Sequence, residues 1–573
     1  MLLLAGTSIY LGASVNPAFY WGCLAVIPLQ WALSVHRRKR AAKARQLQIR
    51  TQWLSRCDPE EDFEWLEVEH EHLCDAAEVD CRVDGQTWND LEMDRVFSRI
   101  DRTWTSLGEV SLYAFLRTPV SHLEQIRERI RLVDVLQSDA ELREAVQKRL
   151  ARLGKTRRFR LNDLEDNRLS ANTFIRNACR VLAGLSALSL ALVALFPVKE
   201  ALLAVIVLFS LNMIVAAWFR WLVYWQANAF LYLTAAISCG KSLGGIEHES
   251  LRLYVEELTE LSNKTRAICR KSRLFEQERN ASAELPALML GYARALFLLD
   301  VSDYFRLAEL VQTHKTSIRR LLKMIGDLDA FQAIASYRKR FPVYCEPVLV
   351  DDGLVLECED CRHPLLDDAV PNSISLRATN AFVTGSNASG KSTFLRTIAL
   401  NALLAQSIGT VPAASYRACC FRILTSISIF DDLSESKSLY RAEAERMLEI
   451  IQATEGPHPI LCSMDEPFKG TNSPERIGAT IATLNHLGGK NILLLVASHH
   501  VQIALELGPR YDVFHFPVSV DGERSESNYL LHRGLDYEFN AIETLAEIGF
   551  PPAIVSSAKA ETARVLGREA AEK

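Results

Sequence analysis

The sequence lacks both a paired cysteine framework and an excess of basic charge. Its 13 cysteines are scattered along 573 residues, which favours a reducing compartment over a secreted, disulfide-bonded fold. The net charge of −5 excludes a global basic field of the kind that attracts nucleic acid. Cys358 and Cys361 form a lone CxxC pair, and without a second ligand pair we interpret them as ordinary thiols rather than a zinc site.

Charged side chains are absent from residues 1–34, and a basic run follows from His36. An uncharged stretch of this length predicts a membrane span with its basic flank in the cytoplasm. A cleaved signal peptide is the alternative, but the stretch lacks a basic start and its apolar part is too long. The pair Asn16-Pro17 could turn a tight hairpin, so one span and two spans both stay open.

Two further uncharged stretches cover residues 181–196 and 201–218. Arginines flank the pair on both sides, and aromatic residues cluster at its C-terminal end, as they do at membrane interfaces. The pattern predicts a transmembrane helical hairpin over residues 175–225 with both ends in the cytoplasm. A buried hairpin in a soluble core is the alternative, because stretches of 16 and 18 residues are near the lower limit for a span.

The spacing of apolar residues changes at Pro342. Before it, apolar residues recur at helical spacing, and after it short apolar runs are separated by Gly, Pro, Asn and Asp. This predicts a helical core followed by an α/β domain with a largely parallel sheet. The predicted strands are 348–350, 354–356, 381–384, 460–464 and 492–497. The predicted domains are an N-terminal transmembrane segment (1–36), a polar cytoplasmic linker (37–87), a helical core in two parts (88–174 and 226–341) around the hairpin (175–225), and the α/β domain (342–573).

The segment after residues 381–384 has the spacing Gly-x4-Gly-Lys-Ser, which is typical of a phosphate-binding loop between a strand and a helix. Glycine lets backbone N–H groups turn toward phosphate oxygens, and the helix adds its positive N-terminal end. We expect Lys391 to reach the β- and γ-phosphates of ATP, and Ser392 to hold Mg²⁺. The predicted ATP-binding residues are Gly385, Ser386, Asn387, Ala388, Ser389, Gly390, Lys391, Ser392 and Thr393.

Two later apolar runs end in residues suited to hydrolysis. Asp465 and Glu466 close the first, so Asp465 is predicted to bind Mg²⁺ and Glu466 to polarise the attacking water as general base. His499 closes the second and is predicted to contact the γ-phosphate as a neutral imidazole, with His500 as the adjacent alternative. The predicted catalytic residues are Glu466, His499 and Lys391, and the predicted cofactors are ATP and Mg²⁺.

The order of these segments resembles that of ABC-type ATPases, and their local sequences resemble the MutS family. The loop is similar to that family's glycine–proline–asparagine loop, with Ser386 in place of proline. Met464-Asp-Glu466 followed by Gly470-Thr-Asn472, and then Ala497-Ser-His499, look like later family motifs. Residues 100–105 and 328–331 resemble the start and the end of the family's helical core.

The resemblance implies a fold and a mode of action. The fold is an α-helical core domain, here with transmembrane helices, plus a C-terminal α/β ABC-type P-loop ATPase domain. The implied assembly is a homodimer whose two ATPase domains close over ATP. In such a dimer, Ser436 or Ser438 of each chain would complete the site of the other chain.

The chain departs from the MutS family in three respects. It contains no Phe-x-Glu, the wedge with which the family reads mismatches, and too few residues precede the helical core to hold the mismatch-reading domain. An apolar hairpin interrupts the region where a soluble relative carries lever or clamp helices. Pro467 follows the acid pair, unlike in MutS proper. The sequence therefore resembles a membrane-attached branch of MutS-like ATPases.

We expect an ATP-driven, dimeric switch in a bacterial-type inner or plasma membrane, crossing it more than once, with its ATPase domain in the cytoplasm. The expected partners are a second copy of the chain, membrane lipid and an unidentified protein. DNA is a candidate ligand by family resemblance, without mismatch-specific reading. One alternative is an ATPase of a membrane process with no DNA role. Another is an ABC transporter, which the absence of an LSGGQ motif disfavours.

Overall fold

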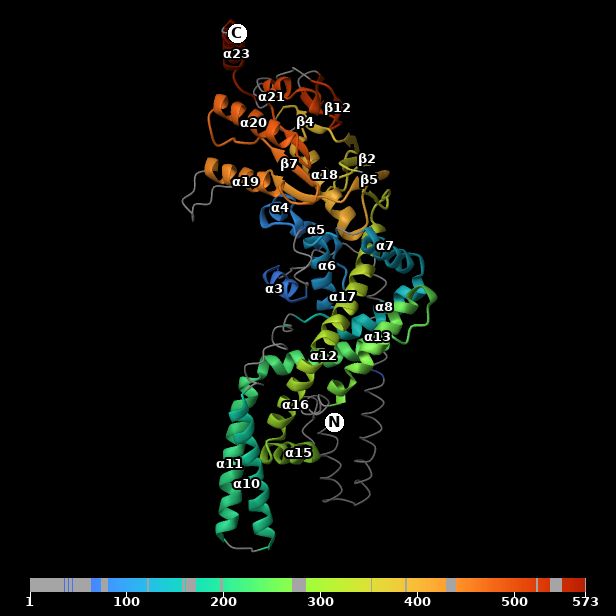
Figure 1. The fold of residues 1–573 in the computed structure, drawn as a ribbon, viewed down its shortest axis with the longest axis vertical. Coiled ribbons are helices and arrows are strands. Elements are labelled where there is room, and N and C mark those ends of the chain that lie inside the picture. The colour runs from blue at the N-terminus through green and yellow to red at the C-terminus, as the bar shows by residue number, and fades with distance from the viewer. Residues whose placement is uncertain are drawn as a thin grey trace, which may run out of the picture.

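The computed structural model describes residues 63–73, 81–120, 123–156, 172–195, 199–270, 285–351, 353–386, 389–428, 439–521, 524–535 and 549–571, with the single residues 36, 40, 44 and 160. The membrane segment predicted over 1–36 therefore lies outside the described residues, apart from His36. Helices occupy the first half of the chain, and strands mixed with helices occupy the second (Figure 1).

The first half is helical, as the spacing of its apolar residues predicts. Helices α6 and α17 pack side by side along its centre, and α7 and α13 also pack on α17. The helices of this half are α3 (Phe63–Leu73), α4 (Gly85–Asp90), α5 (Met93–Ile100), α6 (Ser106–Arg117), α7 (Leu123–Ser138), α8 (Ala140–Leu153), α10 (Thr173–Leu195), α11 (Lys199–Leu222), α12 (Tyr224–Leu243), α13 (Arg252–Lys264), α15 (Leu285–Leu296), α16 (Leu299–Thr313) and α17 (Lys315–Arg338).

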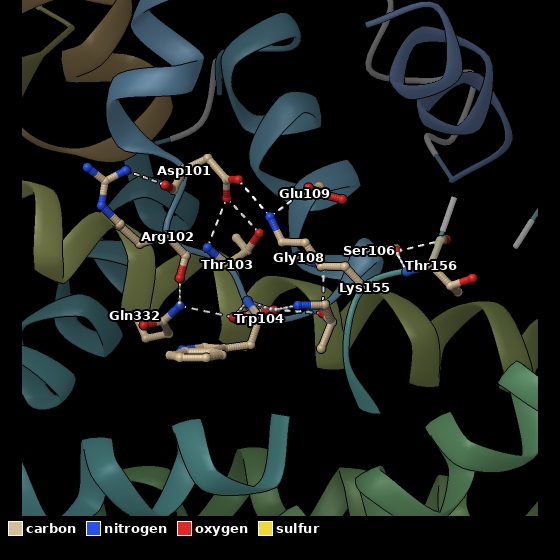
Figure 2. Close-up of polar contacts among 12 residues, drawn as sticks. Asp101, Arg102, Thr103, Trp104, Ser106, Gly108, Glu109, Lys155, Thr156 and Gln332 are labelled. Carbon is tan, nitrogen blue, oxygen red and sulfur yellow. Dashed lines mark hydrogen bonds and ion pairs between the residues drawn. The ribbon is translucent and has the colours of Figure 1, made fainter. Parts of the chain in front are cut away.

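A buried carboxylate joins the start of α6 to α17, and Figure 2 labels its neighbours Trp104 and Gln332. Asp329 of α17 accepts hydrogen bonds from the backbone N–H groups of Trp104 (3.0 Å) and Thr105 (2.8 Å) and from the Thr105 hydroxyl (2.7 Å). Gln332 donates to Asp329 at 3.0 Å and to the Arg102 carbonyl at 2.7 Å. Burial raises the pKa of Asp329 to about 7, against the opposing effect of these donors. The two segments that resemble the ends of the family's core therefore meet at this carboxylate.

A second polar cluster and one glycine set the start of α6. The Lys155 ammonium donates to the carboxylates of Asp101 (2.8 Å) and Glu109 (2.6 Å), as Figure 2 shows. Gly108 lies so close to Asp329 that a Cβ at position 108 would be 2.4 Å from a carboxylate oxygen. Because that oxygen is held by its donors, a larger residue at position 108 would displace α6 from α17.

The acid-rich segment predicted as a polar linker contributes to the folded body in its described part. Helix α3 packs against α6 with Trp65 and Leu66 buried, while Glu64 and Glu67 stay exposed. The prediction of a linker over 37–87 is therefore corrected for residues 63–73. Glu64, Glu67 and Glu71 face solvent, whereas Glu69 is buried with the apolar face of the helix.

Helix α4, at the end of the same segment, docks on strand β6 of the second half. Asp90 accepts hydrogen bonds from the Thr425 hydroxyl (2.7 Å) and the Ile427 N–H (2.9 Å). Arg446 donates to the Asp84 carboxylate (3.1 Å) and the Thr87 hydroxyl (3.0 Å). The acids of α4 thus have partners more than 300 positions away, which no local sequence pattern could indicate.

The second half contains two main sheets. The six-stranded sheet has the order β12-β9-β4-β8-β7-β6, and it is parallel except for β12, as the sequence predicted for its main strands. Of the mixed four-stranded sheet β1-β5-β2-β3, the sequence predicted β1 and the start of β2, whereas β3, β5 and the β10–β11 hairpin were missed. The strands are β1 (Val348–Val350), β2 (Val355–Cys361), β3 (Asn372–Arg377), β4 (Asn380–Thr384), β5 (Ser415–Cys419), β6 (Arg422–Ser426), β7 (Ile460–Asp465), β8 (Ile492–Ala497), β9 (Tyr511–His515), β10 (Val518–Asp521), β11 (Arg524–Ser527) and β12 (His532–Arg533).

Helix α18 (Lys391–Ile408) lies between the six-stranded sheet and the helical body and is almost wholly buried. It packs on β7 and β8 on one side and on α6 and α7 on the other. The other helices of this half are α19 (Leu439–Ala453), α20 (Ser473–Leu487), α21 (Val501–Glu506) and α23 (Pro552–Ala571).

The C-terminal end of α18 is bonded to the C-terminal end of α17. The fully buried Arg338 donates to the Thr410 hydroxyl (2.6 Å) and to the Gly409 carbonyl (2.8 Å). It also forms an ion pair with Asp134 of α7. Since a buried guanidinium without these partners is costly, Arg338 fixes how the ends of α17 and α18 lie against each other.

Helices α10 and α11 form a hairpin at the end of the molecule opposite the sheets (Figure 1). Each is long and apolar enough to cross a membrane by length and composition, and only 17% of its most apolar window is buried. This exposure disfavours the alternative of a hairpin buried in a soluble core. The exposed apolar side chains include Leu185, Leu188, Leu192, Leu195, Leu202, Leu203, Ile206, Val207, Leu211 and Ile214.

Polar side chains line the contact between these two helices. The Asn212 amide donates to the Ser186 hydroxyl at 2.8 Å and to the Leu296 carbonyl, at the end of α15, at 2.6 Å. Asn212 and Ser186 are fully buried. Between residues 186 and 212 the buried side chains of the hairpin are therefore polar (Ser186, Ser189 and Asn212), and Asn212 ties this part to α15.

We predict that Asp329→Ala destabilises the full-length protein. Four hydrogen-bond donors would lose their acceptor in the interior, and each buried unsatisfied group costs roughly 1–3 kcal/mol. The expected result is a fall of several degrees in the apparent Tm, measured by intrinsic fluorescence during heating. Glu124→Ala, at an exposed ion pair on α7, is the control and should leave Tm unchanged. Equal Tm values for both variants would contradict the role assigned to Asp329.

Candidate active site

Three neighbouring strands end at one edge of the six-stranded sheet. The register pairs Val383 of β4 with Ala497 of β8, and Ala497 with Asp465 of β7. Because these strands run parallel, the residues that follow them gather in the crevice beyond their carboxyl ends. The glycine loop, the acid pair and the histidine pair, which are far apart in the sequence, are thereby brought together.

The loop after β4 depends on two glycines. Gly385 has a φ of +144° and Gly390 a φ of +105°, which L-residues with a side chain rarely adopt. A Cβ at position 385 would lie 2.8 Å from the Ser389 hydroxyl. Helix α18 begins directly after the loop, so its unpaired N–H groups face the crevice. Of the predicted loop residues, Asn387 and Ala388 lie outside the described part of the chain.

Lys391 is buried beneath this loop. Its ammonium donates to the carbonyl oxygens of Gly385 and Ser386, at 2.8 Å each. Burial lowers the pKa of Lys391, and the carboxylates of Glu466 and Asp465 oppose that shift. The only described groups that bond the ammonium are backbone carbonyls, which leaves the positive charge available to an anion in the crevice.

Ser392 and Asp465 are in direct contact across the crevice. The Ser392 hydroxyl donates a hydrogen bond to the Asp465 carboxylate. Burial raises the pKa of Asp465, and the neighbouring Glu466 adds to this, whereas the Ser392 hydrogen bond opposes it. A hydroxyl beside a carboxylate that is costly to ionise is a suitable pair of oxygen ligands for Mg²⁺, whose charge would stabilise the carboxylate.

Glu466 is held by the residues that follow β8. Its backbone has a φ of +52°, in the left-handed region where a non-glycine residue is strained. Its carboxylate accepts hydrogen bonds from the His499 N–H (3.0 Å) and the Ser498 hydroxyl (3.3 Å), and lies 2.7 Å from His499 Nδ1. Burial alone would raise its pKa, but the contacts with His499 more than offset this and lower it. The carboxylate is thus kept ionised, as a base must be.

The structure distinguishes His499 from its neighbour His500. The His499 ring contacts Glu466, and 45% of its side chain is exposed. The rings of the two histidines lie 4.0 Å apart, and the Nε2 atom of His500 is enclosed without a hydrogen-bond partner. Glu466, His499 and His500 form the one group within the described ranges whose ligand atoms lie close enough to hold a metal ion. The adjacent alternative, His500, thus lies against the His499 ring, and no described hydrogen bond joins its ring to Glu466.

A cavity of about 520 Å³ opens in front of these residues. Sequence reasoning missed its other wall, which includes Phe516 and Tyr529 from the segments after β9. Asn372 anchors that wall, since its amide donates to the Tyr529 carbonyl at 3.0 Å and accepts from the Leu531 N–H at 2.7 Å. The lining residues are His363, Leu366, Asp368, Ala369, Val370, Asn372, Gly390, Lys391, Ser392, Thr393, Phe394, Thr397, Asp465, Glu466, Phe516 and Tyr529.

The described residues thus bring together Lys391, Ser392, Asp465, Glu466 and His499. Thr393 also lines the cavity. Ser436 and Ser438, which the resemblance places in the site of a second chain, lie outside the described residues. Asn372 lies in the stretch Val370-Pro-Asn372, which resembles the MutS family's lead-in to its nucleotide strand, so a signal for it existed. No sequence motif marks Phe516 or Tyr529.

Comparison with known proteins shows which family the second half of the chain resembles. Residues 381–566 match the family model described as MutS domain V. Residues 381–566 are therefore similar to MutS domain V, and the C-terminal half of the chain is similar to MutS proteins. The matched region contains β4, α18, β7 and β8, and with them every described residue of the candidate site except those that precede β4.

Three similar proteins are each named DNA mismatch repair protein MutS. That of Natronomonas pharaonis is 28% identical over 303 residues, which cover 50% of this chain and 35% of the relative. That of Desulforapulum autotrophicum is 29% identical over 311 residues, covering 51% and 34%. That of Thermus aquaticus is 26% identical over 505 residues, covering 82% and 60%. The matches therefore span between about a third and three fifths of these MutS relatives, and one extends well into the helical body.

We predict that His499→Ala lowers ATP turnover about 10- to 100-fold, whereas His500→Ala changes it far less. Loss of a hydrogen bond to a charged group costs roughly 1.5–3 kcal/mol, which gives this range of rates. Because the His499 contacts lower the pKa of Glu466, the acid limb of the pH–rate profile should move to higher pH in His499→Ala. Steady-state phosphate release between pH 5 and 9 measures both effects. A larger loss in His500→Ala would reverse the assignment.

Proposed function

We propose that this chain is a Mg²⁺-dependent ATPase of the ABC/MutS type that acts as a dimeric switch at a membrane. The observation that carries the ATPase proposal is the convergence of Lys391, Ser392, Asp465 and Glu466 on one cavity beyond the ends of parallel strands. Each of these side chains has the chemistry that phosphoryl transfer to water requires. The family supports the proposal, because its members couple this domain to ATP.

Each side chain has a separate task in the proposed reaction. Lys391 exchanges its loop carbonyls for oxygens of the β- and γ-phosphates. Ser392 and Asp465 hold Mg²⁺, which when bound neutralises charge on the phosphates. Glu466 accepts a proton from the attacking water, and His499 fixes the orientation of that carboxylate. The apolar wall formed by Phe516 and Tyr529 excludes bulk water from the side of the cavity opposite the acids.

The dimer belongs to the proposal through the family resemblance. Two chains would close over two nucleotides, with Ser436 or Ser438 of each chain reaching the γ-phosphate held by the other. The exposed side of the His499 ring supports this arrangement, since it leaves the candidate site open along one face.

The membrane attachment rests on α10 and α11, which expose apolar side chains and bury polar ones. A continuous series of packed helices leads from the cavity to this hairpin. Helix α18 is bonded to the end of α17, α17 contacts α16, and α16 contacts both α10 and α11. Closure of the nucleotide loop would therefore displace the base of the hairpin.

A role in DNA metabolism is the second candidate function, and the names of the similar proteins favour it. Those relatives are named for DNA mismatch repair. The chain has no Phe-x-Glu segment and a net charge of −5, which disfavour mismatch reading and strong electrostatic binding to DNA. An ATPase that drives a membrane process without DNA is therefore our preferred proposal.

Glu466→Gln tests the proposed base. The amide keeps the shape of the carboxylate but cannot accept a proton, so turnover should fall about 100-fold or more while ATP still binds. Fluorescent nucleotide binding and phosphate release measure the two properties separately. Glu455→Gln, in the exposed turn after α19, is the control and should behave as wild type. Equal turnover in wild type and Glu466→Gln would refute the base assignment.

Turnover of the full-length protein in lipid discs separates the two candidate functions. On the preferred proposal, duplex and branched DNA leave turnover unchanged, and the protein stays with the discs through a high-salt wash. Stimulation by DNA that disappears at raised salt would instead favour the role in DNA metabolism, because phosphate contacts release counterions. Glu466→Gln in the same discs gives the background rate.

A further inference from the structure

A cavity lies between the start of α10 and the start of α16, far from the candidate active site. Its volume is about 320 Å³. One wall comes from α10, and the other comes from the turn before α16 and from α16 itself. The lining residues are Arg176, Cys179, Arg180, Ala183, Phe297, Leu298, Leu299, Val301, Ser302, Phe305, Arg306 and Glu309.

The charged side chains of this cavity are mostly basic and unpaired. Three arginines and one glutamate line it. The Arg176 Nε atom is shut off from solvent and has no hydrogen-bond partner. Arg180 and Arg306 are exposed at the rim and form no ion pair with any residue that the structure describes. A buried N–H of a guanidinium without an acceptor is costly, so this atom indicates a missing anionic partner.

The rest of the cavity is apolar. Leu298 adopts a left-handed conformation (φ +48°) at the start of α16, which turns the chain so that Phe297 and Leu299 both reach the cavity. Phe305 and Ala183 add apolar surface from the two helices. A free phosphate would leave this surface against water, whereas an amphiphile would cover it.

We propose that this cavity binds the headgroup phosphate of an anionic phospholipid, with the first carbons of its acyl chains against the apolar wall. The inference rests on the proposed membrane attachment of the α10–α11 hairpin. Arg176 and Arg180 directly precede the uncharged stretch of α10, so they lie at the level of the lipid headgroups on the cytoplasmic side. Guanidinium groups bind phosphate through paired hydrogen bonds, and basic pockets between membrane helices on this side bind anionic headgroups.

A lipid in this position would connect α10 to α16. Arg176 and Arg180 belong to the hairpin, whereas Arg306 belongs to the helix that contacts α17. A phosphate bonded to both sides would hold the base of the hairpin against the helical body. The composition of the membrane would then influence how α16 and the hairpin move relative to each other.

The test measures lipid retained by the full-length protein. Wild type is taken from discs containing phosphatidylcholine with phosphatidylglycerol, and the phosphatidylglycerol bound per chain is counted by native mass spectrometry. Arg176→Gln combined with Arg306→Gln should weaken retention roughly fivefold for each arginine removed. Arg220→Gln is the matched control, because this arginine flanks the same hairpin but does not line the cavity. It should retain phosphatidylglycerol as wild type does.

Any result other than this one contradicts part of the proposal. Equal losses in the double variant and in Arg220→Gln would mean general charge attraction rather than a site. Displacement of the lipid by millimolar glycerol 3-phosphate would mean a site for a soluble phosphate. Flotation of the protein with phosphatidylcholine vesicles tests the membrane attachment separately from the lipid site. If wild type does not float, the membrane proposal fails together with the lipid site, whereas flotation with unchanged retention in all variants refutes the lipid site alone.

Discussion

The structure depends on the fixed length and the two anchored ends of α18. Its first residue, Lys391, is bonded to the loop carbonyls, and the Gly409 carbonyl just beyond its last turn is bonded to the buried guanidinium of Arg338. A helix is stiff along its axis, so the loop cannot move along that axis without moving α17. The same helix supplies the floor of the cavity and the contact surface for α6 and α7. The candidate site and the helical body therefore form one mechanical unit rather than two linked domains.

Buried polar contacts recur at each later joint between elements. Asp329 joins α6 to α17, and Arg294 of α15 forms ion pairs of 2.6 Å with Asp300 and 3.1 Å with Asp303 of α16. Asn212 then joins α11 to the end of α15. Each of these contacts has a defined geometry. Separating a buried charge from its partner is also costly in free energy. Each joint thus has a defined arrangement, and a change at one joint requires a discrete change at the next.

The local sequence pattern was sufficient to predict the strands and the loop around the cavity of the candidate active site. The strands before Gly385, Glu466 and Ser498 are short, apolar and parallel, so that their ends meet once their type is known. Local sequence pattern was not sufficient to predict the polar contacts between residues that are far apart in the sequence. Asp90 lies at the start of the predicted helical core, yet it bonds a backbone group just beyond β6, more than 300 positions away. In the four-stranded sheet, β1 and the start of β2 were predicted as strands, but β3, β5 and the pairing were missed, since the strands pair out of sequence order and carry no motif.

The sequence alone could not decide between a membrane hairpin and a buried hairpin, because both require long apolar helices. The decisive property is which side chains face inward. In a water-soluble hairpin the apolar stripe faces the neighbouring helices and the polar stripe faces solvent. Between residues 186 and 212 this is reversed, since the buried side chains there are Ser186, Ser189 and Asn212 while the leucines around them are exposed. Small and polar residues at the contact between helices are what a hydrocarbon environment favours, because there lipid and leucine are equally apolar. This reversal supports a lipid environment for the hairpin independently of the length and composition of its helices.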